Sequence, residues 1–407
     1  MSAKASGQQV LKQLNDAGYT AYFVGGMVRD TVLGYEIYDA DITTDALPED
    51  VLALFDKTVA TGLQHGTVTV VIDGVNVEVT TFRLDGEYLN NRHPDGVIFT
   101  RSLALDLARR DFTINAMAQA LDGTMIDPFN GRADLEAGVI RAVGEPKKRF
   151  EEDALRILRG IRFVAKLGFD VEEETLKAMK ACSHLLANLS LERIRKEFEG
   201  MIESNNRGQA FKLMHDYELF HAIPYFSIFD QYPVTALAAI DDFKLMLLLA
   251  THHLADSTSF VASYPLTKEE KKLIEDLRAI DSHYSCCDEL DDQHLAMLLQ
   301  YKFGIETLRL KEKFAYIVNI IVAHHTQRPY KSGDFSFTPY DLPIECRADL
   351  GIQPEEIIKL SKKAPGAWLN NLLTHIEEAV VLRKIENTRE SILKWIEKRG
   401  IFNVEED

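Results

Sequence analysis

Two aspartates one residue apart, Asp39 and Asp41, are the side chains of this sequence best suited to chemistry. On a strand, residues two apart face the same side, so both carboxylates would project together while Ala40 and Ile42 face the other way. Two carboxylates that close repel each other unless a divalent cation lies between them. Such ions bridge a triphosphate and activate an incoming hydroxyl in phosphoryl and nucleotidyl transfer. An Asp-x-Asp sequence alone is more often a solvated loop, so a second feature has to support this interpretation.

That second feature is a glycine turn shortly before the aspartates. Residues 22–24 read YFV, Gly25 and Gly26 follow, and apolar residues at helical spacing then run to Leu33 before Gly34. Backbone N–H groups at such a turn point at a bound phosphate, and glycine lets the backbone approach it closely. A glycine pair alone is more often a plain turn. Together and in this order, the glycines and the aspartates predict a site for a nucleoside triphosphate.

The surrounding elements read as a small sheet with helices. Two β-branched runs, residues 65–72 and 75–82, are joined by an Asp-Gly pair, which is a strong hairpin signal. Glu78 alternates with two valines on the second run, so it faces either the two aspartates or water. Helical patterns accompany these strands at residues 6–18, 27–33, 48–55 and 103–108.

A longer helix is predicted over residues 150–163, where Asp153, Arg156, Arg159 and Arg162 recur every three residues. The plain interpretation is an exposed helix with ion pairs between neighbouring turns. The functional interpretation is recognition of nucleobase edges, because aspartate accepts from exocyclic amines and arginine donates to ring nitrogens and carbonyls.

The composition is that of a globular protein with several domains. The chain has 407 residues, of which 46% are hydrophobic and 27% charged. No apolar run approaches the length of a membrane-spanning helix, and the polar N-terminus lacks the core of a signal peptide. The cysteines have neither zinc-site nor disulfide spacing, so we expect reduced thiols in a cytoplasmic protein: Cys182, Cys286, Cys287 and Cys346.

The net charge of −17 argues by itself against a nucleic-acid partner, because basic patches supply most of such affinity. Charge is nevertheless unevenly distributed. Residues 141–166 contain eight Lys or Arg against four Asp or Glu. A basic patch on an acidic protein would bind RNA with modest, salt-sensitive affinity.

Gly25-Gly26, Arg29-Asp30 and Asp39-x-Asp41 together resemble the polymerase-β nucleotidyltransferase superfamily. Two more strings, RRDFTINA at 109–116 and EDALR at 152–156, match further motifs of the tRNA nucleotidyltransferase group within it. The resemblance is strong over residues 20–200 and looser beyond. Over the whole chain it is a resemblance to the class II, Bacillus-type, CCA-adding tRNA nucleotidyltransferases.

The resemblance implies roles for individual residues. Asp39 and Asp41 are expected to hold Mg²⁺ for a two-metal nucleotidyl transfer, and Glu78 is expected to be a third carboxylate. The triphosphate and ribose are expected to contact a set from the two head motifs: Gly25, Gly26, Arg29, Arg110, Asp111 and Asn115.

The resemblance also implies how the base is chosen. Glu152, Asp153 and Arg156 match the motif in which amino-acid side chains select C or A in place of a nucleic-acid template. Arg159 and Arg162 are expected to line the base pocket or the phosphate path. A helix beginning after Ser190 resembles the neck helix that supports this motif, and packing is its expected role.

Residues 83–96 are polar and turn-rich, and so long a loop in a compact domain is usually functional or disordered. They resemble the flexible loop associated with adding the terminal A, so they point away from an enzyme that adds only CC. Asn90 stands where Asp is expected, and His93 where Arg is common.

The predicted fold class is α+β: a nucleotidyltransferase head with a small mixed or antiparallel sheet flanked by helices, followed by an extended all-α part. We expect the head at 1–142, a base-selecting neck at 143–205, a helical body at 206–310 and a tRNA-binding helical tail at 311–407.

The expected function is addition of CCA to tRNA from CTP and ATP. The expected partner is the 3′ acceptor end and elbow of tRNA, with no DNA and no membrane. A poly(A) polymerase is an alternative, although the acidic charge balance and the segment 62–67 favour CCA addition. An A-adding partner of a separate CC-adding enzyme is a second alternative. An inactive RNA-binding relative is a third, and the presence of Asp39, Asp41 and Arg110 argues against it.

Overall fold

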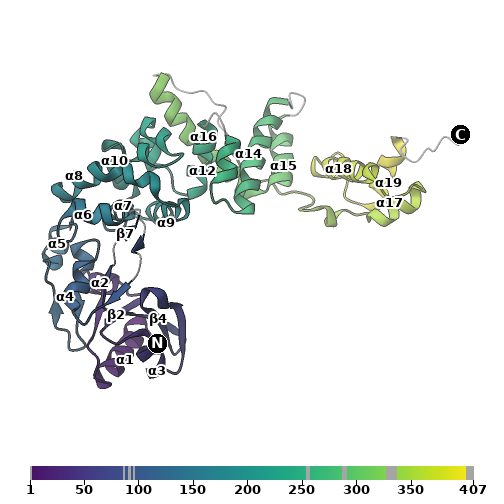
Figure 1. Ribbon diagram of the computed structural model, residues 1–407. Helices are drawn as coiled ribbons and strands as arrows, with labels where there is room; N and C mark the ends of the chain where they lie inside the picture. Colours follow the sequence, from purple (N-terminus) through teal and green to yellow (C-terminus); the bar gives the residue numbers. More distant parts are fainter. Residues whose placement is uncertain are drawn as a thin grey trace. The chain divides into compact units, whose positions relative to one another are not determined.

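The computed structural model describes residues 2–85, 88–89, 93–94, 97–253, 257–286, 291–326 and 337–399 (Figure 1). The chain divides into two compact units. The first unit contains Met1–Met246 and His253–Ala255, and the second contains Leu247–His252 and Asp256–Asp407. This division falls within the body predicted at 206–310, and the four-domain boundaries stay a prediction.

The first unit begins with a seven-stranded sheet in the order β11-β10-β1-β2-β5-β4-β3. Within this sheet β2 and β5 pair in parallel and the other neighbours pair antiparallel, which agrees with the predicted mixed sheet. The strand bounds are β1 Ala21–Val24, β2 Ala40–Thr44, β3 Thr58–Gly62, β4 Thr67–Ile72, β5 Val75–Thr81, β10 Ala118–Gln119 and β11 Met125–Ile126.

The predicted hairpin is confirmed as β4 and β5. Asp73 and Gly74 both have positive φ, 51° and 79°, which is the backbone that a two-residue turn between twisted strands requires. Val77 and Val79 are buried on β5, whereas Glu78 between them is exposed. Alternation along the strand therefore places Glu78 on the open side of the sheet.

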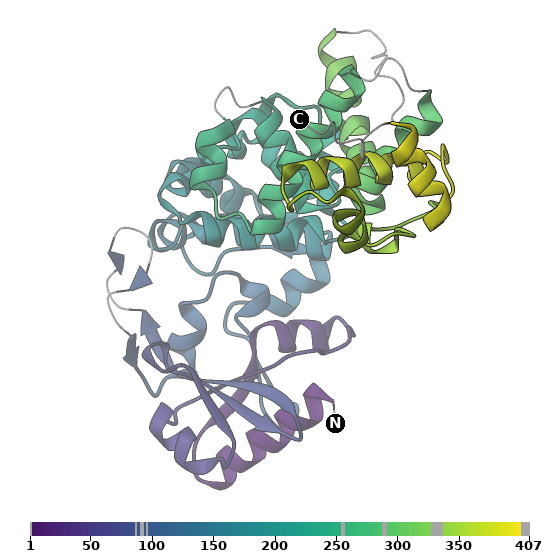
Figure 2. The same ribbon diagram turned by 90° about the vertical axis from the view of Figure 1, so that its right-hand side faces the viewer.

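Helices cover this sheet (Figures 1 and 2). Helix α1, Ala3–Asp16, packs on β1, β2, β4 and β5. The close approach depends on Gly7, since a Cβ there would lie 2.9 Å from Phe23 Cε1 and 3.0 Å from Ala40 Cβ. The other head helices are α2 Gly25–Val32, α3 Pro48–Leu54, α4 Leu103–Ala108 and α5 Gly131–Ala137. The predicted helices are confirmed, and the glycine pair proves to be the first turn of α2.

The described part of residues 83–96 consists of short strand pairs. β6, Arg83–Asp85, pairs with β9, Val97–Phe99, and β7, Tyr88–Leu89, pairs with β8, His93–Pro94. Asn90 and the side chain of His93 lie outside the described residues, so the expectations about them stay predictions.

The helix predicted over 150–163 is two helices, α6 Pro146–Glu152 and α7 Leu155–Leu167. Asp153 between them has an extended backbone, with φ −142° and ψ 104°. Its Oδ1 accepts a hydrogen bond from Leu155 N at 3.0 Å, which is the local side-chain contact by which aspartate competes with helix continuation. The prediction of one continuous helix was therefore wrong at this residue.

The remaining elements of the chain are mainly helical. β12 Val139–Ile140 pairs in parallel with β13 Asp170–Val171. The helices are α8 Glu173–Cys182, α9 Leu191–Ile202, α10 Arg207–Asp216, α11 Val234–Ala238, α12 Phe243–His253, α13 Ser257–Ser263, α14 Lys268–Cys286, α15 Asp292–Phe303, α16 Ile305–Thr326, α17 Pro354–Ser361, α18 Ala367–Val381 and α19 Arg389–Lys398. None of the described helices is long and apolar enough to cross a membrane.

Cys182 is buried and Cys346 is exposed, and both are free thiols, as predicted. The side chains of Cys286 and Cys287 lie outside the described part of the chain.

Candidate functional site

The aspartate pair lies at the start of β2. Asp39 is exposed just before the strand, and Asp41 is its second residue. Ala40 and Ile42 are 2% and 1% exposed, and Ala40 faces α1. Asp41 therefore points to the opposite face of the sheet, as the alternation predicts.

Glu78 lies beside Asp41 in the parallel register of β2 and β5, where the two are paired residues. Paired residues of neighbouring strands point to the same face, so Glu78 lies on the face of the sheet that carries Asp41, where its side chain is also exposed to water. Burial, the charge of Glu78 and the charge of Asp39 raise the pKa of Asp41 to about 6, against the opposing effect of Arg110 and Arg29.

This cluster of negative charge fits a divalent cation. Within the described residues, no group of three His, Cys, Asp or Glu side chains is close enough to hold a metal by itself. Mg²⁺ needs no such cage, because it commonly binds one or two carboxylates together with water and substrate phosphates. The aspartate pair is therefore suited to a divalent cation whose remaining ligands are water and the phosphates of a bound nucleotide.

Gly25 joins this cluster to the second head motif. Its φ is +65°, and a Cβ on it would lie 3.3 Å from Arg110 Nη1 and 3.6 Å from Asp41 Oδ2. The Arg110 Nε is buried and has no hydrogen-bond partner among the described residues. An unpartnered guanidinium donor beside the carboxylates is what a phosphate oxygen would satisfy.

Asp106, which the sequence analysis did not single out, orients the two arginines of this motif. It is fully buried in α4, and its Oδ2 lies 3.1 Å from Arg110 Nη2 while its Oδ1 lies 2.8 Å from Arg109 Nη2. Burial alone would raise the pKa of Asp106, but the two guanidinium groups lower it below its ordinary value. Its spacing of three and four residues from the arginines was the signal that could have identified it.

A hydrogen-bonded chain links the glycine-turn helix to the neck. Arg29, 3% exposed, donates from Nη1 to Asn115 Oδ1 at 2.9 Å. Asn115 Nδ2 in turn donates to Asp111 Oδ1 at 3.3 Å. Arg159 of α7 completes the chain, with Nη2 2.6 Å from Asp111 Oδ2. Four predicted site residues from two motifs and the neck are thus in direct contact.

Asp111 is the one carboxylate of the hydrogen-bonded series Arg29–Asn115–Asp111–Arg159. Burial would raise its pKa, but the ion pair with Arg159, the N–H of Phe112 and the charge of Arg156 lower it to about 2. A buried carboxylate held in this way positions the surrounding donors rather than titrating near neutral pH.

Arg159 also belongs to a group of cations around Phe163. The guanidinium carbons of Arg29, Arg159 and Arg162 lie 5.4, 5.8 and 5.5 Å from the centroid of this ring. Lys166 Nζ lies 3.9 Å from Asp30 Oδ2, and burial followed by the charge of Arg29 lowers the pKa of Lys166. The guanidinium groups gathered around Phe163, with Lys166 nearby, favour an anionic ligand.

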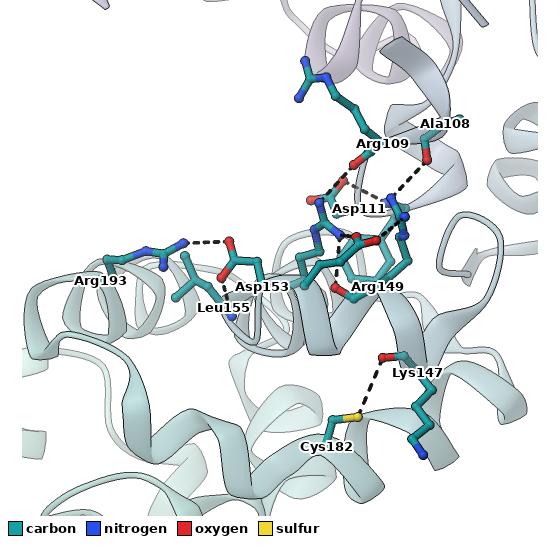
Figure 3. Close-up of polar contacts among 12 residues, drawn as sticks. Ala108, Arg109, Asp111, Lys147, Arg149, Asp153, Leu155, Cys182 and Arg193 are labelled. Carbon is teal, nitrogen blue, oxygen red and sulfur yellow. Dashed lines mark hydrogen bonds and ion pairs between the residues drawn. The ribbon is translucent and has the colours of Figure 1, made fainter. Parts of the chain in front are cut away.

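Arg156 and Asp153, predicted as a base-reading pair, each bond other residues, and Figure 3 shows Asp153 facing Arg193 of α9. Arg156 is 7% exposed, and its guanidinium donates to Glu152 Oε2 at 2.7 Å and to Arg109 O at 3.0 Å. It therefore ties α7 to α6 and to the end of α4. Asp153 Oδ2 instead accepts from Arg193 Nη2 of α9 at 2.7 Å.

Arg193 is a second contact residue outside the predicted site, because packing was the expected role of α9. Arg162 also contacts α9, with its Nε 2.6 Å from Glu197 Oε2, and its expected role in the base pocket or the phosphate path stays a prediction. Helix α9 thus engages two residues of the predicted base-reading stretch through Arg193 and Glu197.

Three family models match successive parts of the chain. They are the poly A polymerase head domain over residues 21–141, the probable RNA and SrmB-binding site of polymerase A over 168–229, and the putative tRNA nucleotidyltransferase domain 2 over 240–396.

Curated relatives match over nearly the full length. The chain is 36% identical to a CCA-adding enzyme of Staphylococcus epidermidis, with 95% of this chain and 96% of the relative covered. It is 38% identical to a CCA-adding enzyme of Lactobacillus helveticus, with 95% of each covered. Among solved structures, the Bacillus stearothermophilus CCA-adding enzyme in complex with CTP matches with a TM-score of 0.77 and 33% identity, covering 98% of both chains.

Proposed function

The chain belongs to the CCA-adding enzymes, the tRNA nucleotidyltransferases that its motifs resemble, and we propose that its head and neck residues divide the work of this reaction as follows. The reaction adds CCA to the 3′ end of tRNA from CTP and ATP. In each step the terminal hydroxyl of the RNA attacks the α-phosphorus of the nucleotide. A new phosphodiester bond forms as the bond to pyrophosphate breaks.

The carboxylates of β2 hold the reacting groups in this proposal. Asp39 and Asp41 bind a divalent cation, with Glu78 adding to the negative charge that attracts it. Enzymes of this superfamily generally use divalent metals, and we propose Mg²⁺ because all these donors are carboxylate oxygens. Such an ion supplies Lewis acidity, which lowers the pKa of the attacking hydroxyl and neutralises the phosphates. The observation that carries the proposal is the geometry at the start of β2, where Glu78 pairs in register with Asp41 and a Cβ on Gly25 would lie 3.6 Å from Asp41 Oδ2 and 3.3 Å from Arg110 Nη1.

The triphosphate is bound by the head arginines. Arg110, fixed by Asp106, offers the buried Nε that has no partner among the described residues. Gly25 allows this guanidinium to lie against the backbone next to Asp41. The ribose and the neighbouring phosphates bind against the hydrogen-bonded series formed by Arg29, Asn115 and Asp111.

The base is selected by the neck. A carboxylate at Asp153 accepts from the exocyclic amine of the base, and the Arg156 guanidinium donates to the adjacent ring nitrogen. C and A present this pair of atoms at different distances from the ribose, so the placement of the two side chains can distinguish them. Because Arg193 already bonds Asp153 and Glu152 already bonds Arg156, reading a base requires these donors and acceptors to be shared or exchanged. We propose that Arg193 and Glu152 position the base-reading side chains, and that Arg159 and Arg162 supply positive charge behind them. Because tRNA is the substrate, we place the enzyme in the cytoplasm.

Primer extension with labelled nucleotides tests this function. The substrates are tRNA ending at the discriminator base, tRNA ending in C, tRNA ending in CC, and an unstructured RNA. The proposal expects three residues on the first substrate, two on the second, one on the third and none on the last. A single A on the CC substrate alone would instead establish an A-adding enzyme, and a long A tail on the unstructured RNA would establish a poly(A) polymerase.

A further inference from the structure

The second unit contains a cavity of about 570 Å³ that the reaction described above does not use. It lies among α18, α19 and the segment that follows α17, which are neighbours near the C-terminal end of the chain (Figure 1). Helix α18 presents one face to it, through residues spaced by three and four positions: Trp368, Asn371, Leu372 and His375. Trp395 and Arg399 at the end of α19, and Lys363 after α17, complete the lining.

Aromatic rings dominate this cavity. The chain has two tryptophans in 407 residues, and both of them, Trp368 and Trp395, line it. Each indole packs partly against the hydrophobic core of α15, α17, α18 and α19 and is only half-buried. Trp368 is further fixed by a hydrogen bond from its Nε1 to Ala364 O at 2.8 Å. A half-exposed, fixed indole offers a π-face to a planar ligand, and nucleobases stack on such faces whatever their sequence.

The charged residues of the lining are cationic. Lys363 Nζ lies 6.0 Å from the Trp368 ring and Arg399 Cζ lies 3.9 Å from the Trp395 ring. None of the described residues that line the cavity is a carboxylate, although the protein has a net charge of −17. Neither Lys363 nor Arg399 forms an ion pair within the described part of the chain, whereas nearby Lys394 is paired with Glu390. The positive charge of the cavity is therefore available to an anionic ligand.

We propose that this cavity, here called the tryptophan pocket, binds an unstacked base of the tRNA substrate together with its flanking phosphates. The base stacks on the indoles, and the Asn371 amide lies where it can pair with a base edge. Arg399 now covers the Trp395 ring, and it exchanges this contact for a phosphate when the base enters. The volume lies within the range of about 300–1,000 Å³ for small-ligand sites and accommodates a nucleotide. The inference rests on the proposed function in one respect, which is that tRNA is the substrate.

The two tryptophans make the pocket directly observable. Because the chain has no others, its intrinsic tryptophan fluorescence reports this pocket alone. Titrating the full-length protein with tRNA that lacks CCA is expected to quench the emission with a saturable curve that matches the binding isotherm. CTP or ATP alone, at concentrations that saturate incorporation, is expected to leave the emission unchanged.

Variants separate stacking from charge. Trp368→Leu or Trp395→Leu is expected to weaken tRNA binding by about 5- to 150-fold, which is the effect of losing one base–aromatic stack. Trp368→Phe or Trp395→Phe keeps a stacking ring, so it should retain most of the affinity and leave one tryptophan as reporter. Lys363→Gln and Arg399→Gln are each expected to reduce the slope of log affinity against log salt by about 1. Lys394→Gln is the matched control, because it removes a cation of α19 that is already paired outside the pocket.

Two results would overturn the proposal. Quenching by CTP or ATP alone as complete as that by tRNA would make the pocket a free-nucleotide site. Leu variants that keep the folded circular-dichroism spectrum and bind tRNA like the parent would show that no base stacks there. Both measurements are of binding, so a protein that binds tRNA through this pocket but fails to add CCA would contradict only the proposed function.

Discussion

The Asp153 carboxylate accepts a hydrogen bond from Arg193 of the neighbouring helix, with 2.7 Å between Oδ2 and Nη2. The same carboxylate receives the Leu155 N–H on its other oxygen at 3.0 Å. The residue expected to read the base is thus held from both sides, which fixes its orientation before any nucleotide arrives. Preorganisation of this kind is how a site discriminates between similar ligands.

Asp153→Ala is expected to blur the choice between CTP and ATP more than it slows chemistry. A specific contact to a base edge gives about 1–3 kcal/mol of discrimination, so the ratio of the two kcat/KM values should fall by about 5- to 150-fold. The measurement is competition between the two nucleotides on tRNA ending at the discriminator base. Glu151→Ala, which removes an exposed carboxylate two residues away, is the control. Unchanged selectivity in Asp153→Ala would remove this residue from base selection.

Arg193→Gln is expected to show part of the same loss, because Asp153 would keep its charge but lose its fixed orientation. In a double-mutant cycle the two changes should be strongly non-additive, as residues in direct contact usually are. The cycle is measured on the CTP-to-ATP selectivity ratio. Effects that simply add would mean that Arg193 supports the fold independently of Asp153.

Arg159→Gln is expected to destabilise the first unit at neutral pH. The variant leaves Asp111 buried without its main counter-charge. Removing one partner of a buried ion pair lowers the free energy of unfolding by about 3–5 kcal/mol. The lower end, about 3 kcal/mol, applies here because Arg159 is one-third exposed. That corresponds to a fall of roughly 6 to 12 °C in Tm. Arg132→Gln, which breaks an exposed pair with Glu136, should change Tm little.

The Asp111–Arg159 ion pair also decides how the stability of the first unit depends on pH. The pKa of Asp111 is lowered to about 2, so its stabilising contribution is fully present above the ordinary aspartate pKa and is lost as the pH falls through 2. The Tm difference between Arg159→Gln and the parent should therefore shrink as the pH is lowered from about 4 towards 2. A difference that stays constant over this range would contradict the assignment.

Gly25→Ala is expected to impair nucleotide binding and turnover through Arg110. The added Cβ meets Arg110 Nη1 at 3.3 Å, and a residue with a side chain at φ +65° is strained by about 1–2 kcal/mol. Gly18→Ala is a matched control, because Gly18 also has positive φ, +92°, but its Cβ would meet nothing within 4 Å. Both variants should lose similar stability, while Gly25→Ala alone raises the KM for CTP and ATP. Equal kinetics in the two variants would show that Gly25 serves only the backbone.

The local features of this site were readable from the sequence, whereas its long-range pairs were not. The alternation of side chains along β2 predicted the face of the sheet to which Asp41 points. The Asp-Gly pair predicted the hairpin of β4 and β5, which carries Glu78. The partner of Asp153 could not be read in this way, and neither could the contact of Arg156 with Arg109 O. The pair of Arg156 with Glu152, in contrast, has the local spacing of four residues. Ion pairs such as Asp153–Arg193 join residues 40 positions apart, and no local period encodes them.

The helix break at Asp153 was missed for a different reason. The arginine spacing continues across it at helical period, but the Asp153 side chain bonds the Leu155 N–H and ends the first helix. Asp106 was also missed, although its spacing from Arg109 and Arg110 would have indicated it.

The central claim is that the carboxylates of β2 form the catalytic metal site, and Asp41→Asn tests it most directly through two readouts on the same protein. The pKa of Asp41 is raised to about 6, so its contribution to stability is present below the ordinary aspartate pKa and lost as the pH rises through 6. Without metal, the variant should therefore melt higher than the parent at pH 8 and not at pH 4. Mg²⁺ should raise the Tm of the parent at pH 8 and leave that of the variant unchanged. The variant should incorporate no nucleotide while binding tRNA normally, and retained turnover with an unchanged response to Mg²⁺ would contradict the account.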